Sequence, residues 1–425
     1  MAASQAARKP ALHEYDGAGD YDPDNYNFHI GAPHQKELLE CSKIIESATL
    51  SLAKAPVDFR TSAFQYGREQ GAEPVLSALA GFLSQEYQRP VDPENLMITA
   101  GASMAFTLVC TEFFCKYPGG GTPVVFVEHP TYFLVMNIAQ DFGFHVEPIP
   151  THVNGEIDFG QWAAVAGKIH HTTSPTSRPF KSMVYLVPTF RNPTGVTLTE
   201  ETANKIHNFC VEQNLLIHCD DVYNILYYGE KPPVKLFPVG ESNVISAGTF
   251  SKLLGPGLRV GWVEAPKEII SKLGSNGMVV SGGCVAQFSS FLIERAITSG
   301  DLTRHVKDLR ARYTEKVRAI SAALKAGLPE SVKWTSPTGG YFVWIVLPEG
   351  SAEFITKELV PAAKAVGVRF GVGARSCPLR GASPCELGCP NALRLSLGHV
   401  TVDQIPEGIA RLCKLLRDRF GGLKA

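Results

Sequence analysis

The chain has 425 residues, with 40 Lys and Arg against 41 Asp and Glu, so its formal net charge is −1. Both signs are mixed along the sequence, which argues against a nucleic-acid or membrane-surface partner, because both require a concentrated basic face. At about 150 residues per domain, the length favours two to three domains and excludes a single small module.

The ten cysteines are scattered singly along the chain. This pattern favours free thiols in a reducing compartment, and we expect a cytoplasmic protein. Cys377, Cys385 and Cys389 lie near one another, but they lack a C-x-x-C pair and a fourth ligand at the usual spacing. We therefore expect a thiol-rich loop and no metal.

The first residues carry no apolar run, so we expect no signal peptide. The longest uncharged stretch, 273–293, is too rich in Gly, Ser, Asn and Gln to span a bilayer. We therefore expect no membrane segment.

Short β-rich runs recur between residues 95 and 263, and most are separated by segments with helical spacing. This pattern predicts an α/β domain with a mainly parallel, buried sheet. The predicted strands are 95–99, 123–127, 145–149, 183–187, 215–219, 243–248 and 258–263. Residues 302–324 predict a long amphipathic helix, and strands at 341–347 and 391–397 predict a smaller α+β unit after it.

The first segment with candidate chemistry is MITAGASMAFTLV at 97–109, in which Gly101, Ala102 and Ser103 lie between a strand and an apolar helix. Free backbone N–H groups at a helix N-terminus can bind a phosphate. A simple helix cap is the alternative.

Two further predicted strands end in polar residues. In VPTFRNPTG at 187–195, the turn begins at Asn192, although an Asn-Pro turn is also a common structural feature. In LLIHCDDVYNILYY at 215–228, the strand runs into Asp220 and then Tyr223. A carboxylate at the end of a buried strand is costly unless it faces a cation or a proton donor.

The most informative segment is GTFSKLLGPGLRVGW at 248–262. Ser251 and Lys252 follow an apolar strand, and Arg259 lies behind a Gly-Pro-Gly turn. An amine, hydroxyls and a guanidinium in this order could serve an aldehyde cofactor that carries a phosphate. A surface lysine in a turn would explain this segment taken alone.

The four segments together resemble the fold-type I, pyridoxal-phosphate-dependent class I and II aminotransferases, and most of all their kynurenine/α-aminoadipate branch. The motifs are Thr249–Lys252 with Pro256–Arg259, Asn192–Gly195 and Asp220–Tyr223. The resemblance runs from Asn27 to the C-terminal helix. It implies a large cofactor-binding domain over 46–300, and a small domain made of 1–45, with an N-terminal arm, and 301–425.

The resemblance also implies the roles of the residues that face the cofactor ring. Lys252 would form the internal Schiff base and move a proton between the substrate Cα and the cofactor. Asp220 would pair with the pyridinium nitrogen, and Tyr223 and Asn192 would donate hydrogen bonds to the ring 3-oxygen. Tyr132 matches the aromatic residue that stacks on the ring.

The cofactor phosphate would be held by the residues Ala102, Ser103, Thr249, Ser251 and Arg259. Tyr66 matches a tyrosine that reaches the cofactor of the neighbouring subunit, which implies a homodimer.

For the substrate, the resemblance implies that Arg394 in NALRLSL grips the α-carboxylate, with Gly31 and Asn192 against the substrate. Arg191 stands where the family commonly has Gln or His, and we expect it to face solvent. The loop 373–391 is longer and richer in cysteine than is usual, so its Arg375 and Arg380 could compete with Arg394 or recognise a second acid group.

The predicted function is therefore a transaminase that moves an amino group to a 2-oxo acid from a 2-aminoadipate-like, aromatic or large aliphatic amino acid. A pyridoxal-phosphate-dependent lyase, decarboxylase or bond-forming enzyme is the first alternative, because the same residues support any reaction that begins at Cα. A cofactor-sensing regulator is the second alternative, and the stretch before Asn27 is too short for the DNA-binding module that it needs.

Overall fold

A computed structural model describes residues 25–117, 121–152, 155–169, 178–237, 239–241, 243–378 and 388–422. Arg380, Cys385 and most of the predicted N-terminal arm lie outside these ranges. In the described part of the chain, no helix combines the length and the apolarity that crossing a bilayer requires.

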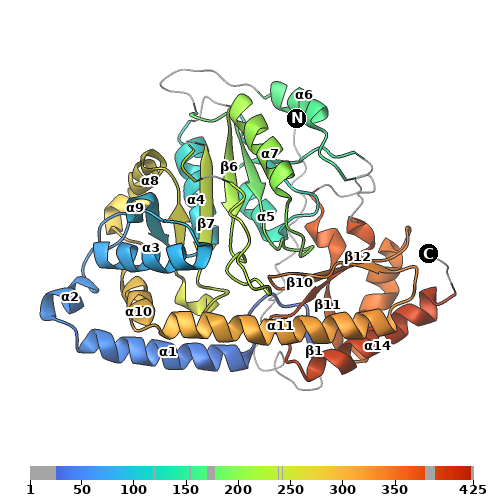
Figure 1. Cartoon of the computed structure of the whole chain (residues 1–425). Helices are drawn as coiled ribbons and strands as arrows, with labels where there is room; N and C mark the ends of the chain where they lie inside the picture. Colours follow the sequence, from blue (N-terminus) through green and yellow to red (C-terminus); the bar gives the residue numbers. More distant parts are fainter. Residues whose placement is uncertain are drawn as a thin grey trace.

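A seven-stranded sheet forms the centre of the larger part of the molecule (Figure 1). In sheet order, its strands are β2 (Leu96–Thr99), β8 (Gly261–Glu264), β7 (Val244–Thr249), β6 (Leu215–Asp220), β5 (Ser182–Leu186), β3 (Val124–Val127) and β4 (His145–Pro148). β8 alone runs opposite to the other strands of this sheet. The predicted α/β fold with a mainly parallel sheet is confirmed.

Side chains of the central strands alternate between two apolar cores. Tyr185 and Leu216 face one core, whereas Val184 and Ile217 face the other. The period of two is that of a strand covered on both faces. The first core contains α4, and the second contains α6 and α7.

Helices surround this sheet, and α1 runs below it in Figure 1. They are α1 (Gln35–Ala53), α2 (Val57–Ser62), α3 (Glu73–Tyr87), α4 (Ala102–Cys110), α5 (Phe133–Asp141), α6 (Phe159–Gly167), α7 (Glu200–Glu212), α8 (Lys267–Gly274), α9 (Gly277–Gly282) and α10 (Gln287–Thr298). The short segments η2 (Pro93–Asn95), η3 (Thr111–Cys115) and η5 (Pro256–Leu258) lie between them.

A second sheet has five strands in the order β1 (Tyr26–Phe28), β11 (Val368–Val372), β12 (Ala392–Ser396), β10 (Phe342–Val346) and β9 (Lys333–Trp334). The remaining elements are α11 (Asp301–Gly327), α12 (Ala352–Phe354), η6 (Ile355–Leu359), α13 (Val360–Ala365), η7 (Gly373–Ser376), η8 (Cys389–Asn391) and α14 (Gln404–Phe420). The N-terminal strand β1 pairs with β11 in parallel, which brings the start of the described chain beside its C-terminal third.

Helix α11 matches the predicted long helix and packs against α10, α1 and α14, so it connects the surroundings of both sheets (Figure 1). The predicted boundary between the domains at residue 46 falls inside α1 and stays a prediction.

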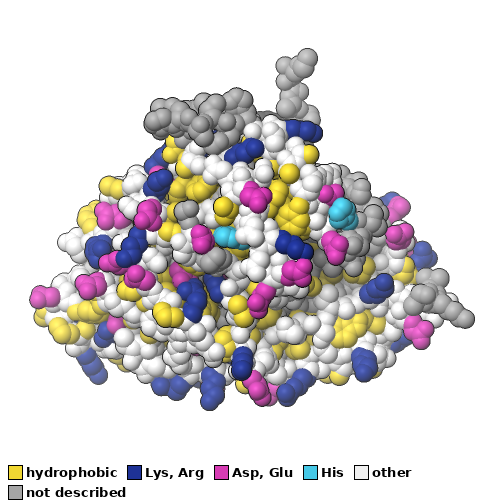
Figure 2. All heavy atoms as spheres, turned by 45° about the horizontal axis from the view of Figure 1, so that its top comes forward, with side chains coloured by type: hydrophobic (Ala, Val, Ile, Leu, Met, Phe, Trp, Pro, Cys, Tyr) yellow, Lys and Arg dark blue, Asp and Glu magenta, His cyan; other side chains and the backbone are white. Residues whose placement is uncertain are grey.

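The surface visible in Figure 2 carries Lys and Arg side chains interspersed with Asp and Glu. This face therefore shows the mixed charge that the composition indicates.

A buried ion pair connects α1 to α11: Lys316 Nζ lies 3.0 Å from Glu37 Oε1, and both side chains are buried. Replacing Lys316 by Met should lower the free energy of unfolding by about 3–5 kcal/mol, because a buried carboxylate loses its cation. Urea unfolding at one fixed protein concentration measures the change.

The matched control is Lys205→Met, which removes an exposed pair with Glu201 on α7. We expect it to change the free energy of unfolding by less than about 0.5 kcal/mol. Equal effects of the two substitutions would contradict the stabilising role of the buried pair.

Candidate active site

A cleft lies where the carboxyl ends of the central strands meet the second sheet. It is partly open to solvent, and its empty volume, including the open space at its mouth, is about 1140 Å³. It brings together predicted site residues that are widely separated in sequence. These are Gly31, Ala102, Ser103, Tyr132, Asn192, Asp220, Tyr223, Thr249, Ser251, Lys252, Arg259 and Arg394. Tyr66 does not line the cleft and is 78% exposed.

Lys252 follows β7, and its Nζ donates a hydrogen bond to the Gly31 carbonyl oxygen at 2.7 Å. Burial lowers the pKa of Lys252 to about 8; the charge of Asp220 opposes this shift, whereas Arg394 and Arg259 add to it. At pH 7 about a tenth of the amine is therefore neutral, far more than for an ordinary lysine, and a neutral amine is the form that attacks an aldehyde.

Asp220 ends β6 and is buried. The Tyr185 hydroxyl donates to its Oδ2 at 2.5 Å, while Oδ1 is buried and has no hydrogen-bond partner within the described ranges. Burial raises the pKa of Asp220 to about 6, against the opposing effect of the Tyr185 hydrogen bond. The unpaired oxygen can accept a hydrogen bond from a protonated ring nitrogen in the cleft.

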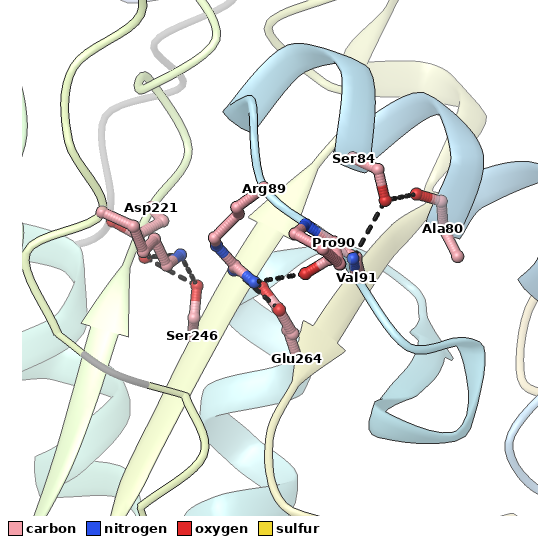
Figure 3. Close-up of polar contacts among 9 residues, drawn as sticks. Ala80, Ser84, Arg89, Pro90, Val91, Asp221, Ser246 and Glu264 are labelled. Atoms are coloured by element: carbon pink, nitrogen blue, oxygen red, sulfur yellow. Dashed lines mark hydrogen bonds and ion pairs between the residues drawn. The ribbon is translucent and has the colours of Figure 1, made fainter.

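The next residue, Asp221, holds the end of β6 in place (Figure 3). Its Oδ2 accepts hydrogen bonds from Ser246 Oγ at 2.6 Å and from Lys235 Nζ at 2.5 Å. Figure 3 also shows Arg89 against Glu264, an ion pair that joins the chain after α3 to β8. The Asp221 contact with Ser246 joins the end of β6, which carries Asp220, to β7, which precedes Lys252.

One end of the cleft is suited to an anion. Ala102 and Ser103 open α4, whose N-terminus has no side-chain cap. Arg259 lies beside it and donates to the Ala100 carbonyl oxygen at 2.7 Å. A Cβ at Gly101, where φ is +96°, would lie 2.7 Å from Arg259 Nη2, so only glycine allows this approach. Free N–H groups and a guanidinium together favour a phosphate.

Two hydroxyls precede Lys252 at the same end of the cleft. Ser251 N and Ser251 Oγ lie 3.1 Å and 2.9 Å from Thr249 Oγ1, so the hydroxyls are held together. Both residues line the cleft.

The other end of the cleft is built around Arg394 on β12. Its guanidinium donates to Asn192 Oδ1 at 3.0 Å and to the His29 carbonyl oxygen at 2.7 Å, and it lies 4.6 Å from the centre of the Phe342 ring. A buried, two-pronged donor of this kind suits a carboxylate. Tyr223 is buried, and its ring packs edge-on against Phe342.

Tyr132 lines the cleft from the N-terminus of α5. Phe133, the next residue, also lines it and lies 4.5 Å below the Arg375 guanidinium. Arg375 is exposed, and it shares a small adjoining pocket with Arg394. It therefore lies at the edge of the cleft, beside the carboxylate-binding end.

Tyr185 and His218, which were not predicted from the sequence, also line the cleft from neighbouring strands. The two rings are stacked with their centroids 5.9 Å apart, and burial lowers the pKa of His218 to about 4. In both MVYLV and LLIHC a polar ring interrupts an apolar run, and this was the available signal. His218 also precedes Asp220 by two positions, and residues i and i+2 of a strand share a face.

Two expectations were wrong. Arg191 is buried rather than solvent-facing, because its guanidinium pairs with buried Glu128, which also accepts a hydrogen bond from Val187 N at 2.8 Å. Cys377 and Cys389 are not free thiols but form a disulfide. The contact is possible because η7 and η8 pack against each other. The other seven described cysteines are free.

The family model described as "Aminotransferase class I and II" matches residues 27–412. Aromatic-amino-acid aminotransferase 1 of Thermococcus litoralis is 31% identical over 84% of this chain and 81% of its own length. The 2-aminoadipate transaminase of Thermus thermophilus is 30% identical over 84% of this chain and 82% of its own length. The crystal structure of Pyrococcus horikoshii kynurenine aminotransferase resembles this chain with a TM-score of 0.77 and a sequence identity of 28%. The match covers 95% of this chain and 92% of that chain.

The lowered pKa of Lys252 leads to a pH-dependence that does not require turnover. In the cofactor-free protein, acetylation of Lys252 should rise with pH with a midpoint near 8, because only the neutral amine reacts. Exposed Lys205, whose pKa is raised by its hydrogen bond with Glu201, should react with a midpoint above the usual lysine value. Mass spectrometry of peptides after short acetylation pulses measures both; equal midpoints would contradict the effect of burial.

Proposed function

The chain belongs to the class I and II aminotransferases, which use pyridoxal phosphate, and from that premise we propose its substrates, its site residues and its assembly. We propose that it takes the amino group from an aromatic, 2-aminoadipate-like or large aliphatic amino acid and gives it to a 2-oxo acid. The observation that carries the proposal is one cleft in which a lysine of lowered pKa, a half-satisfied buried carboxylate and a buried arginine meet.

The residues present fit pyridoxal phosphate. The unpaired Asp220 Oδ1 suits the ring nitrogen, and the N-terminus of α4 with Arg259 suits the phosphate. When bound, the cofactor supplies an aldehyde for the amine and a ring that accepts electrons from the substrate Cα. Lys252 would hold the cofactor and carry the proton, and Tyr132, Tyr223 and Asn192 would bind its ring.

Residues at the other end of the cleft would bind and orient the substrate. Arg394 would grip the α-carboxylate, and Asn192, which it already contacts, would share the contact. The Gly31 carbonyl, which now accepts from Lys252, would lie against the substrate. Asp220, charged above its pKa of about 6, would keep a proton on the ring nitrogen at neutral pH.

We also propose that Ser251 and Thr249 bind the cofactor phosphate in the cleft of their own chain. A homodimer is proposed as well, in which Tyr66 reaches the cofactor of the partner subunit. In support, Tyr66 lies outside the cleft of its own chain, and Phe64, Val57 and Phe288 are also exposed apolar side chains. A sedimentation measurement that finds a monomer would contradict this. The free cysteines are our reason for proposing a cytoplasmic location.

The reaction is tested by mixing the purified holoenzyme with a panel of single amino acids and recording absorption spectra. Conversion to the pyridoxamine form, reversed by a 2-oxo acid, is expected with aromatic and 2-aminoadipate-like donors. Asp220→Asn should keep the cofactor but slow this half-reaction about a hundredfold or more, because a neutral amide cannot hold the ring nitrogen protonated. Product release without the pyridoxamine form would instead favour the lyase alternative.

Substrate recognition is tested with Arg394→Ala and Arg375→Ala. The first should lower kcat/KM for every donor about a hundredfold, because truncating a buried charged partner costs about 2–5 kcal/mol. The second should affect only donors with a side-chain carboxylate, by about fivefold, since an exposed pair contributes at most about 1 kcal/mol.

The control for both is Arg318→Ala on the exposed side of α11, which should leave all donors unaffected. Steady-state kinetics with phenylalanine, leucine and 2-aminoadipate decide the matter. If Arg375→Ala slows all three donors equally, Arg375 is not a second anchor.

A further inference from the structure

Three side chains with metal-binding atoms meet beside the substrate cleft. Cys377 follows η7, Cys389 opens η8, and His129 lies between β3 and Tyr132. One ligand atom from each residue lies within 4.8 Å of the other two. The three residues come from two distant parts of the sequence, so their meeting is a product of the fold.

The imidazole of His129 points to a ligand independently of the cysteines. Its Nε2 is buried and has no hydrogen-bond partner in the described part of the chain. A buried polar nitrogen without a partner is unfavourable, so it calls for an explanation, and a bound ion is one. The transamination machinery does not employ this nitrogen.

The two sulfur atoms share a polar neighbour. Sγ of Cys389 lies 3.5 Å from the Gly373 carbonyl oxygen, and Sγ of Cys377 lies 3.8 Å from the same atom. A Cβ at Gly373 would lie 2.4 Å from the Cys389 carbonyl oxygen, so glycine is needed for η7 and η8 to approach this closely. The backbone is therefore shaped to hold the two cysteines together whether or not they are bonded.

We propose that His129, Cys377 and Cys389 form a binding site for a thiophilic divalent cation, with zinc as the ion, when the two cysteines are reduced. Two thiolates and a neutral imidazole are donors that Zn²⁺ prefers. Their charges cancel that of the ion, so burial leaves no net charge in the site. Three protein ligands leave a fourth position for water.

The disulfide and the metal exclude each other. A dithiol reductant supplies two electrons and two protons to break the S–S bond, and is itself oxidised to a disulfide. The two thiols then release two protons as two S–Zn bonds form. The same three residues thus have an oxidised, metal-free state and a reduced state that binds zinc.

The site is connected to the wall of the substrate cleft. Thr131, two residues after His129, donates a hydrogen bond from its N–H to the carbonyl oxygen of Ser376 at 3.0 Å, and Ser376 directly precedes Cys377. Ser376 and Arg375 line the small pocket beside Arg394. Zinc would therefore tie this wall to the segment that carries Tyr132.

The test uses the full-length holoenzyme, dialysed against zinc chloride with a phosphine reductant and then against zinc-free buffer. Elemental analysis should find one zinc per chain in the reduced wild type and none after oxidation. Cys377→Ser and His129→Gln should each lose the zinc. The matched control, Cys115→Ser, removes an exposed free thiol outside the cluster and should retain it.

Cobalt in place of zinc provides a second readout that reports the ligands directly. Intense visible bands of tetrahedral cobalt with thiolate charge transfer are expected in the wild type and in Cys115→Ser, and their loss in Cys377→Ser. Absence of stoichiometric metal from the reduced wild type would overturn the proposal. So would retention of zinc by both Cys377→Ser and His129→Gln, with cofactor content showing that the variants are folded.

Discussion

A carboxylate buried at the end of a strand must be stabilised by donors, and the site is arranged around this requirement at Asp220. One oxygen is satisfied by Tyr185, and the other is left for a group that enters the cleft. Because the second oxygen has no partner among the residues that the structure describes, part of the cost of burying the charge is left uncompensated by the protein. A cation-like ring nitrogen relieves that cost, so the same contact binds the cofactor and keeps it protonated.

The second constraint is that the cleft needs both sheets. Lys252 and Asp220 come from the large sheet, whereas Arg394 comes from the small one and contacts Asn192 across the cleft. The chain closes this arrangement through β1, which pairs with β11 and leads to Gly31 and the amine of Lys252. A substrate carboxylate at Arg394 would lie beside the contact that joins Arg394 to Asn192, so substrate binding and the positions of the two sheets are coupled.

The sequence was sufficient for features that depend on local pattern. The buried strands were recognisable from continuous apolar runs, and the chemistry at their ends from Asn192, Asp220 and Lys252. Strands β1, β9 and β11 were missed because they are short or lack a strong apolar pattern. Arg191 is buried because it pairs with Glu128, and Cys377 bonds to Cys389 because η7 approaches η8. Neither could be predicted, because contacts between distant segments leave no local pattern in the sequence.

The pairing of β5 with β6 sets Tyr185 opposite His218, two residues before Asp220, so that all three side chains lie on one face. A slip of one residue would bring Val184 or Leu186 to that face and would remove the phenol from the carboxylate. The two strands could still pair and bury apolar side chains, so the protein would look folded while lacking its central contact. A single-residue insertion or deletion within either strand would turn these side chains to the opposite face of the sheet. The chemistry therefore excludes such changes in evolution, even where the sheet itself would tolerate them.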